Sequence, residues 1–133
     1  MATILIIDDD ADVRDTLALV LEEAGHTTVM AKSGAEGARI FGETRPALVL
    51  TDMIMPESDG LEAMSAIRAL DSAVRIIAMS GASFAGSSYY LKLAKRFGAI
   101  AVLPKPFEPD ELVSMVNSCL SAPPPAKTSD TTQ

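Results

Sequence analysis

The sequence predicts a single α/β domain in which helices cover both faces of a doubly wound parallel sheet. Short apolar runs alternate with stretches of helical spacing along the chain, and polar or charged residues follow most of these runs. The 133 residues suffice to bury a core without disulfides, and the single cysteine, Cys119, has no partner within the chain. We expect the folded domain to span residues 1–120.

The first strand is expected at residues 4–7, and the helix after it ends before Gly25. A weaker apolar run at 27–31 is the second strand. Ser33 and Glu36 have the spacing of a capping box and open the second helix. The apolar side of the first helix consists of Val13, Leu17, Val20, Leu21 and Ala24.

The third strand is expected at residues 47–50, and Asp59 with Glu62 opens the helix that follows it. The fourth strand is expected at 74–79, and the fourth helix at 87–97.

The last apolar run, at residues 99–103, is the fifth strand, and Pro109 suits the first turn of the fifth helix. After Leu120, small, polar and proline residues replace the apolar ones. Residues 121–133 are therefore expected to be a disordered tail or the start of a linker.

The formal net charge of −7 at pH 7 argues against a nucleic-acid-binding protein, because such proteins need clustered basic side chains. The basic cluster in the sequence is small and consists of Lys92, Lys95 and Arg96. No stretch resembles a signal peptide, and serines and glycines interrupt the longest uncharged run, residues 76–91. We expect a cytoplasmic protein that binds neither nucleic acid nor membrane.

Polar side chains stand at the carboxyl ends of four predicted strands, and parallel strands bring these ends together. They are Asp8 and Asp9, Asp52, Ser80 and Lys105. If the first and third strands are neighbours, the aspartates crowd, and carboxylates about 4 Å apart repel by roughly 4 kcal/mol at an effective dielectric of about 20. Mg²⁺ and Lys105 are the candidate counter-charges. A carboxylate nucleophile, a cation, a lysine and a hydroxyl together are typical of a phosphoryl-transfer site.

Four segments resemble the receiver domain of two-component response regulators. They are residues 4–10, 48–56 with Asp59 and Gly60, 79–81 and 103–107, and the resemblance extends from residue 3 to about residue 120. It implies a flavodoxin-like fold with strand order 2-1-3-4-5. It also implies a phosphorylation-dependent signalling switch that accepts a phosphoryl group from a sensor histidine kinase or a histidine phosphotransfer protein. Such a switch is not an enzyme beyond its own phosphorylation and dephosphorylation.

The resemblance assigns roles to residues of this chain. Asp52 is implied to be the phosphoacceptor. Asp9 and Asp52 are implied to bind Mg²⁺ through their side chains, Asp8 mainly through water, and Ile54 through its backbone carbonyl. Lys105 is implied to pair with the phosphate.

Further implied features concern the neighbours of these residues. Ser80 is implied to donate a hydrogen bond to a phosphate oxygen, and the small Gly81 leaves the acceptor accessible. The bond between Lys105 and Pro106 is implied to be cis. The implied output surface comprises the fourth helix, the fifth strand and the fifth helix. We expect a monomer or a phosphorylation-dependent dimer that acts on an unknown protein target.

Two features depart from the usual receiver pattern. Val102 stands where many receivers carry a Tyr or Phe that moves on activation. The candidates for a replacement aromatic are Phe84, Tyr89 and Tyr90. Ile54 and Ala82 occupy positions that influence dephosphorylation, and neither side chain can orient a water molecule by hydrogen bonding. We therefore expect a long-lived phosphoryl group.

Two alternatives stay open at this point. A degenerate receiver would act only as a protein-binding module, although the complete set of site residues argues against it. An Asp-nucleophile phosphohydrolase of the haloacid dehalogenase type would require Thr or Val at the position of Asp12. We interpret Asp10 and Asp12 as residues of a helix N-terminus and His26 as a loop residue.

Overall fold

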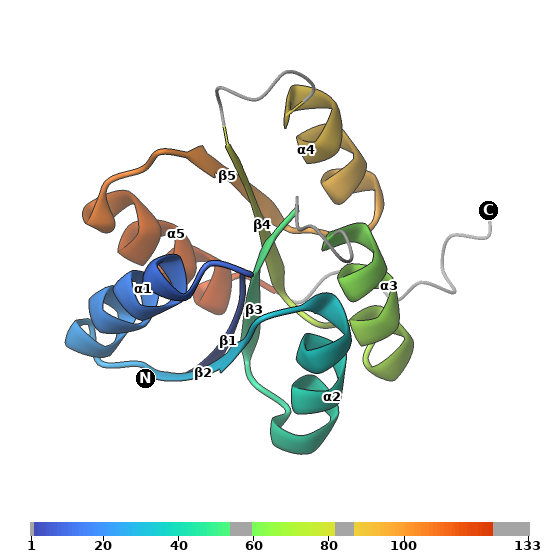
Figure 1. Ribbon diagram of the computed structural model, residues 1–133, viewed down its shortest axis with the longest axis horizontal. Coiled ribbons are helices and arrows are strands. Elements are labelled where there is room, and N and C mark those ends of the chain that lie inside the picture. The colour runs from blue at the N-terminus through green and yellow to red at the C-terminus, as the bar shows by residue number, and fades with distance from the viewer. Residues whose placement is uncertain (1, 54–59, 82–86, 124–133) are drawn as a thin grey trace.

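The computed structural model describes residues 2–53, 60–81 and 87–123. Within this part of the chain, five parallel strands alternate with five helices (Figure 1). The strands lie in the order β2-β1-β3-β4-β5, which confirms the predicted flavodoxin-like arrangement. In chain order the elements are β1 (Thr3–Ile7), α1 (Ala11–Glu23), β2 (Thr27–Ala31), α2 (Gly34–Thr44), β3 (Leu48–Asp52), α3 (Gly60–Leu70), β4 (Ile76–Gly81), α4 (Ser87–Arg96), β5 (Ala101–Lys105) and α5 (Pro109–Ser121).

Helices cover both faces of the sheet, with α1 and α5 on one face and α2, α3 and α4 on the other (Figure 1). The sheet has a hydrophobic core on each face, and alternate residues of β1 pack into one core or the other. Ile4 and Ile6 pack with α1 and α5, whereas Leu5 and Ile7 pack with the helices of the opposite face. Because all four side chains are fully buried, the strand reads as a continuous apolar run.

The strands β4 and β5 begin two residues later than predicted. Val74 lies in a turn, where its N–H donates to the Asp71 carbonyl (3.2 Å). Ala99 follows Gly98, which has a φ of 111°, and its N–H donates back to the Ala94 carbonyl of α4 (2.9 Å). Val74 and Ala99 are buried although they are not in strands. Their burial explains why the apolar runs placed both strand starts wrongly.

The helix starts agree with the predicted capping residues. The Asp10 side chain accepts hydrogen bonds from two backbone N–H groups in the first turn of α1. Ser33 Oγ accepts from the N–H of Glu36 at the start of α2 (3.1 Å). The Glu36 carboxylate accepts from the N–H of Lys32 (2.7 Å), so the return bond of the capping box reaches the residue before the cap. Asp59 lies outside the described residues.

Three arginines meet the C-terminal ends of helices at the amino end of the sheet. Arg45, which has a φ of 48°, donates from Nη1 to the last carbonyl of α3 (3.3 Å). Arg75 donates from Nη2 to the Ala122 carbonyl, which caps α5 (2.8 Å). Arg68 packs closely on Gly98, which follows the C-terminal end of α4. A methyl group at Gly98 would overlap the Arg68 guanidinium. These cations therefore complement the negative ends of the helix dipoles.

The helix α5 ends at Ser121, one residue beyond the predicted limit of the domain. Residues 124–133 lie outside the described part of the chain, so the tail stays a prediction. None of the described helices is long and apolar enough to cross a membrane.

Candidate functional site

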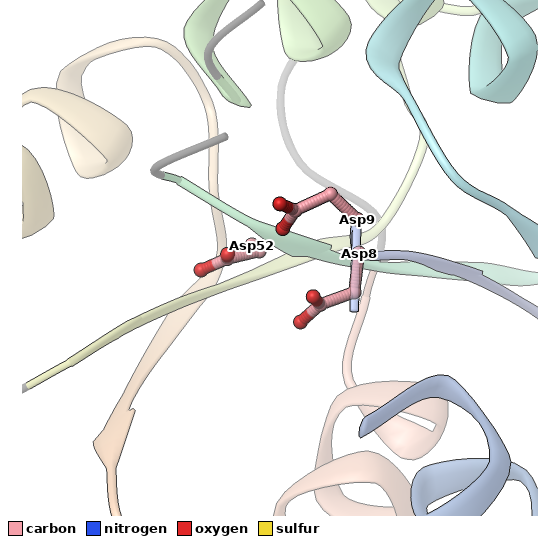
Figure 2. A group of neighbouring side chains, drawn as sticks. All are labelled: Asp8, Asp9 and Asp52. Atoms are coloured by element: carbon pink, nitrogen blue, oxygen red, sulfur yellow. The ribbon is translucent and has the colours of Figure 1, made fainter. Parts of the chain in front are cut away.

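Three carboxylates meet at the carboxyl end of the sheet, between β1 and β3. Figure 2 shows Asp8, Asp9 and Asp52 grouped there, and one oxygen of each lies within 4.8 Å of the others. The pairing of Ile7 with Thr51 places the residues that follow them side by side. Asp8 is 1% exposed and Asp52 is 7% exposed, whereas Asp9 is open to solvent. The crowding expected from parallel strands is therefore present, with two of the three charges taken out of water.

Lys105 supplies a positive charge to this cluster from β5. Its Nζ lies 3.2 Å from Oδ2 of Asp8 and 3.6 Å from Oδ1 of Asp52. The peptide bond that joins it to Pro106 is cis, as expected from the resemblance. One ammonium group faces three carboxylates, so this end of the sheet keeps an excess of negative charge.

Asp8 is held at all of its polar groups. Its N–H donates to the Ala31 carbonyl (3.1 Å), and its carboxylate accepts from the N–H of Asp10 (3.0 Å) and from Lys105. Its backbone carbonyl accepts a hydrogen bond from Nη1 of Arg14 (2.7 Å). The position of this aspartate is therefore set by contacts from β2, from β5 and from the start and first turn of α1.

Arg14 was not identified as a site residue from the sequence. A signal for it was present, because a cation in the first turns of a helix lies at the positive end of the helix dipole and is locally unfavourable there. Arg14 is the fourth residue of α1. Such a placement indicates that the side chain has a partner outside its own helix.

Ser80 is fully buried on β4, and its hydroxyl has no hydrogen-bond partner among the described residues. Leaving a buried hydroxyl unpaired costs about 1–3 kcal/mol. Ser80 directly follows Met79, which pairs with Asp52 across β3 and β4, and Gly81 then pairs with Lys105. The unpaired donor therefore lies in the strand between the aspartate and the lysine.

The donor set fits a hard divalent cation. Carboxylate oxygens are the ligands that Mg²⁺ prefers, and it commonly uses one or two carboxylates together with water and phosphate oxygens. Asp8, Asp9 and Asp52 offer three such groups at the required spacing. The excess negative charge at this end of the sheet favours the same cation.

The structure describes only some of the remaining predicted site residues. Ile54, Ala82 and Phe84 are outside the described residues. Tyr89 and Tyr90 belong to α4, but their side chains are not described. Val102 on β5 pairs with Ala78 and packs, partly buried, against the core shared with α2, α3 and α4.

An apolar pocket of about 360 Å³ opens beside Lys105, between α1 and the segment that joins β5 to α5. It was not predicted, because its walls come from two segments far apart in sequence. Its lining consists of Asp12, Val13, Thr16, Leu17, Lys105, Pro106 and Phe107.

His26 lies in the loop between α1 and β2, as expected, but it is also buried. Its Nδ1 accepts a hydrogen bond from the N–H of Ala2 (3.2 Å). Its Nε2 therefore carries the ring proton and donates to Oδ1 of Asn117 on α5 (3.0 Å). This histidine joins the start of the chain to the last helix and takes no part in the acidic site.

The chain resembles known proteins along nearly its whole length. It is 33% identical over 117 residues to sporulation initiation phosphotransferase F of Bacillus subtilis, and the alignment covers 88% of this chain and 92% of that protein. It is 31% identical over 119 residues to the chemotaxis protein CheY of Halobacterium salinarum, and this alignment covers 90% of this chain and 97% of that protein. The DNA-binding transcriptional regulator NtrC of Azospirillum brasilense is 35% identical over 131 residues, but this chain spans only 27% of it.

Solved structures agree with the sequence relatives. The receiver domain of NtrX from Brucella abortus superimposes with a TM-score of 0.83 at 29% identity, covering 90% of this chain and 98% of that one. Residues 4–117, from β1 into α5, match the sequence model of the response regulator receiver domain. Because this match takes in every strand of the sheet, the chain belongs to the response regulator receiver domain family.

Proposed function

We propose that this chain is a phosphorylation-dependent switch in which Asp52 accepts a phosphoryl group. The main support is the composition of the carboxyl end of the sheet. There a buried aspartate lies 3.6 Å from a lysine ammonium, two further carboxylates lie beside it, and the hydroxyl of Ser80 has no hydrogen-bond partner among the described residues. Such a site is incomplete as it stands, because it has carboxylates without enough cations and a donor without an acceptor.

In the reaction, the phosphoryl group passes from a histidine of the donor protein to Asp52. A carboxylate oxygen of Asp52 attacks the phosphorus of the donor, the bond from phosphorus to the donor nitrogen breaks, and its electron pair stays on the departing imidazole. Mg²⁺, when bound, neutralises charge on the phosphoryl oxygens and on the carboxylates. Asp8, Asp9 and Asp52 would hold it, together with the Ile54 carbonyl expected from the resemblance.

Lys105 and Ser80 would stabilise the product. Lys105 already lies between Asp8 and Asp52, so its ammonium needs only a small movement to pair with a phosphoryl oxygen. The Ser80 hydroxyl would donate to another phosphoryl oxygen and so lose the penalty of being buried unpaired. A shift at the end of β4 would then alter the neighbouring surface of α4, β5 and α5, which is the output surface that we propose.

The phosphodonor is proposed to be a histidine kinase or a histidine phosphotransfer protein. Its histidine must come within bonding distance of Asp52, so the donor has to cover the surface around the carboxyl end of the sheet. The apolar pocket beside Lys105 lies on that surface and offers a place for an apolar side chain of the donor. Its walls belong to α1 and to the segment after β5.

The phosphoryl group is proposed to be lost slowly. Ile54 and Ala82 have no hydrogen-bonding side chain with which to hold an attacking water. A double variant, Ile54→Asn with Ala82→Glu, should shorten the lifetime of the phosphoryl group at a fixed Mg²⁺ concentration. An unchanged or longer lifetime would contradict this part of the proposal.

The test of the proposed function is incubation of the full chain with acetyl phosphate and Mg²⁺, followed by intact-mass measurement. We expect the mass to rise by one phosphoryl group, and we expect no rise in Asp52→Asn. Asp15→Asn, a matched change on the exposed side of α1, should label like the wild type. Sustained hydrolysis of many phosphate esters would indicate the phosphohydrolase instead, and absence of labelling would indicate a degenerate receiver.

A further inference from the structure

Arg14 contacts both ends of the loop that holds the three consecutive aspartates. Its backbone N–H donates to the carbonyl of Asp10 (3.0 Å), which is an ordinary bond of the first helical turn. Its guanidinium turns back, and Nη1 donates to the carbonyl of Asp8 (2.7 Å). The side chain is half-buried. One residue thus ties Asp8 and Asp10 to α1, with Asp9 between them.

The contact to Asp8 determines where Asp9 points. A peptide unit is planar, so a carbonyl that is held in one direction also fixes the N–H and the Cα position of the following residue. The Asp9 side chain is exposed and makes no hydrogen bond within the described part of the chain, so its direction depends on the backbone on either side of it. Arg14 therefore helps to orient the Asp9 carboxylate toward Asp8 and Asp52, together with the bond from the Asp10 N–H to the Asp8 carboxylate (3.0 Å).

We infer that Arg14 is a positioning residue for the cation site, an inference that rests on the proposed function. It touches neither the phosphoryl group nor the cation in this role. It acts by holding the Asp8 carbonyl, and through it the direction of the Asp9 side chain. Mg²⁺ demands nearly ideal octahedral geometry, so a loop that can rotate offers a poorer site.

The charge of Arg14 acts in the opposite direction. A cation close to three carboxylates weakens the attraction of this end of the sheet for a second cation. Removal of the charge alone would therefore tighten Mg²⁺ binding, whereas loss of the hydrogen bond would weaken it. Residues that orient metal ligands typically contribute about 10-fold to 100-fold in metal affinity, so we expect the loss of position to dominate.

The experiment measures Mg²⁺ affinity of the full chain by isothermal titration calorimetry, without any phosphodonor. We expect Arg14→Met to raise the dissociation constant about tenfold. Arg14→Lys keeps the charge that opposes cation binding but loses the planar guanidinium, so it should bind Mg²⁺ at least as weakly as Arg14→Met. The matched control is Arg39→Met, which removes the same charge from an exposed ion pair on α2 and should leave the affinity unchanged.

A second readout separates positioning from a general loss of stability. In Arg14→Met the amide of Asp10, which donates to the Asp8 carboxylate, should exchange with solvent faster than in the wild type. The rate of labelling by acetyl phosphate should need more Mg²⁺ to reach half its maximum, but should return to the wild-type rate at saturating Mg²⁺. If Arg14→Met does not fold, the same three measurements on Arg14→Lys decide the question.

Each outcome has a distinct meaning. An unchanged or tighter Mg²⁺ affinity in Arg14→Met, while the wild type binds Mg²⁺ and is labelled on Asp52, would overturn the inference and leave the proposed function intact. A wild type that binds no Mg²⁺ and gains no phosphoryl group would overturn the proposed function itself. A rate that stays low at saturating Mg²⁺ would show that Arg14 acts otherwise than through the cation site.

Discussion

The two ends of the sheet differ in how their charged groups are paired. At the amino end, Arg45, Arg68 and Arg75 each lie against the C-terminal end of a helix, where backbone carbonyls carry partial negative charge. At the carboxyl end, Lys105 pairs with two of three clustered carboxylates, and the buried hydroxyl of Ser80 has no partner among the described residues. At the amino end the helix ends are met by cations of the chain itself, although Arg75 Nε is buried without a partner among the described residues, whereas the carboxyl end keeps carboxylates and a hydroxyl that ligands can satisfy.

This difference separates the source of stability from the source of function. A satisfied contact, such as the bond from Arg75 to the α5 terminus, lowers the free energy of the folded chain permanently. An unsatisfied contact costs free energy until a cation or an oxyanion arrives, and that cost becomes binding energy for the ligand. Neutralisation of an arginine should therefore destabilise the amino end, whereas neutralisation of a carboxylate should stabilise the carboxyl end.

The largest expected effect is at Gly98, on the amino end. Gly98→Ala introduces a side chain at a φ of 111° and into the space occupied by the Arg68 guanidinium. The left-handed backbone alone costs about 1–2 kcal/mol, and the displaced arginine adds to it. We expect the free energy of unfolding to fall by about 2–3 kcal/mol in chemical denaturation.

The control for Gly98→Ala is Gly25→Ala. Gly25 has a φ of 98°, and a Cβ there would meet nothing within 4 Å, so this variant has the backbone strain without the overlap. The difference between the two variants measures the contact with Arg68. Equal losses of stability would show that the Arg68 contact contributes nothing.

A smaller effect of opposite sign is expected at Asp9, on the carboxyl end. Asp9→Asn removes one of three clustered charges and breaks no hydrogen bond among the described residues. Because Asp9 is exposed to solvent, the relief of repulsion amounts to about 1 kcal/mol or less. Without Mg²⁺, we expect thermal unfolding at a slightly higher temperature than in the wild type, and with Mg²⁺ we expect the order to reverse.

Two variants test whether the gain is local. Asp15→Asn changes the net charge equally on the exposed side of α1, and its effect gives the general contribution of a less negative chain. Arg75→Met neutralises a charge at the amino end, and it should lower stability with no change in Mg²⁺ affinity. A gain in Asp9→Asn no larger than in Asp15→Asn would argue against crowding at the carboxyl end.

The sequence predicted the part of the site that follows from strand order. Parallel strands bring their carboxyl ends together. The residues at or just after these ends are therefore expected to lie close together, whatever the direction of their side chains. They are Asp8, Asp9, Asp52, Ser80 and Lys105. The strand starts at Val74 and Ala99 were wrong because burial alone produces an apolar run, whether or not the residue lies in a strand.

The contacts that sequence reasoning missed depend on where side chains turn after packing. The Arg14 side chain extends past the start of α1 to the Asp8 carbonyl. The buried His26 ring makes hydrogen bonds to Ala2 and to Asn117, which lie near the two ends of the chain. The apolar pocket needs α1 and the segment after β5 to lie side by side, although they are far apart in sequence. No local periodicity reports any of these arrangements.

Completion of the carboxyl end by phosphorylation can be tested in a crystal structure of the full chain with Mg²⁺ and beryllofluoride, a mimic of the phosphoryl group. We expect the mimic on Asp52, with the Ser80 hydroxyl and the Lys105 ammonium both hydrogen-bonded to it, while the arginine contacts of the amino end stay unchanged. A mimic bound to Asp52 with the Ser80 hydroxyl still unpaired, or a mimic bound away from Asp52, would contradict the claim that the carboxyl end is completed by phosphorylation.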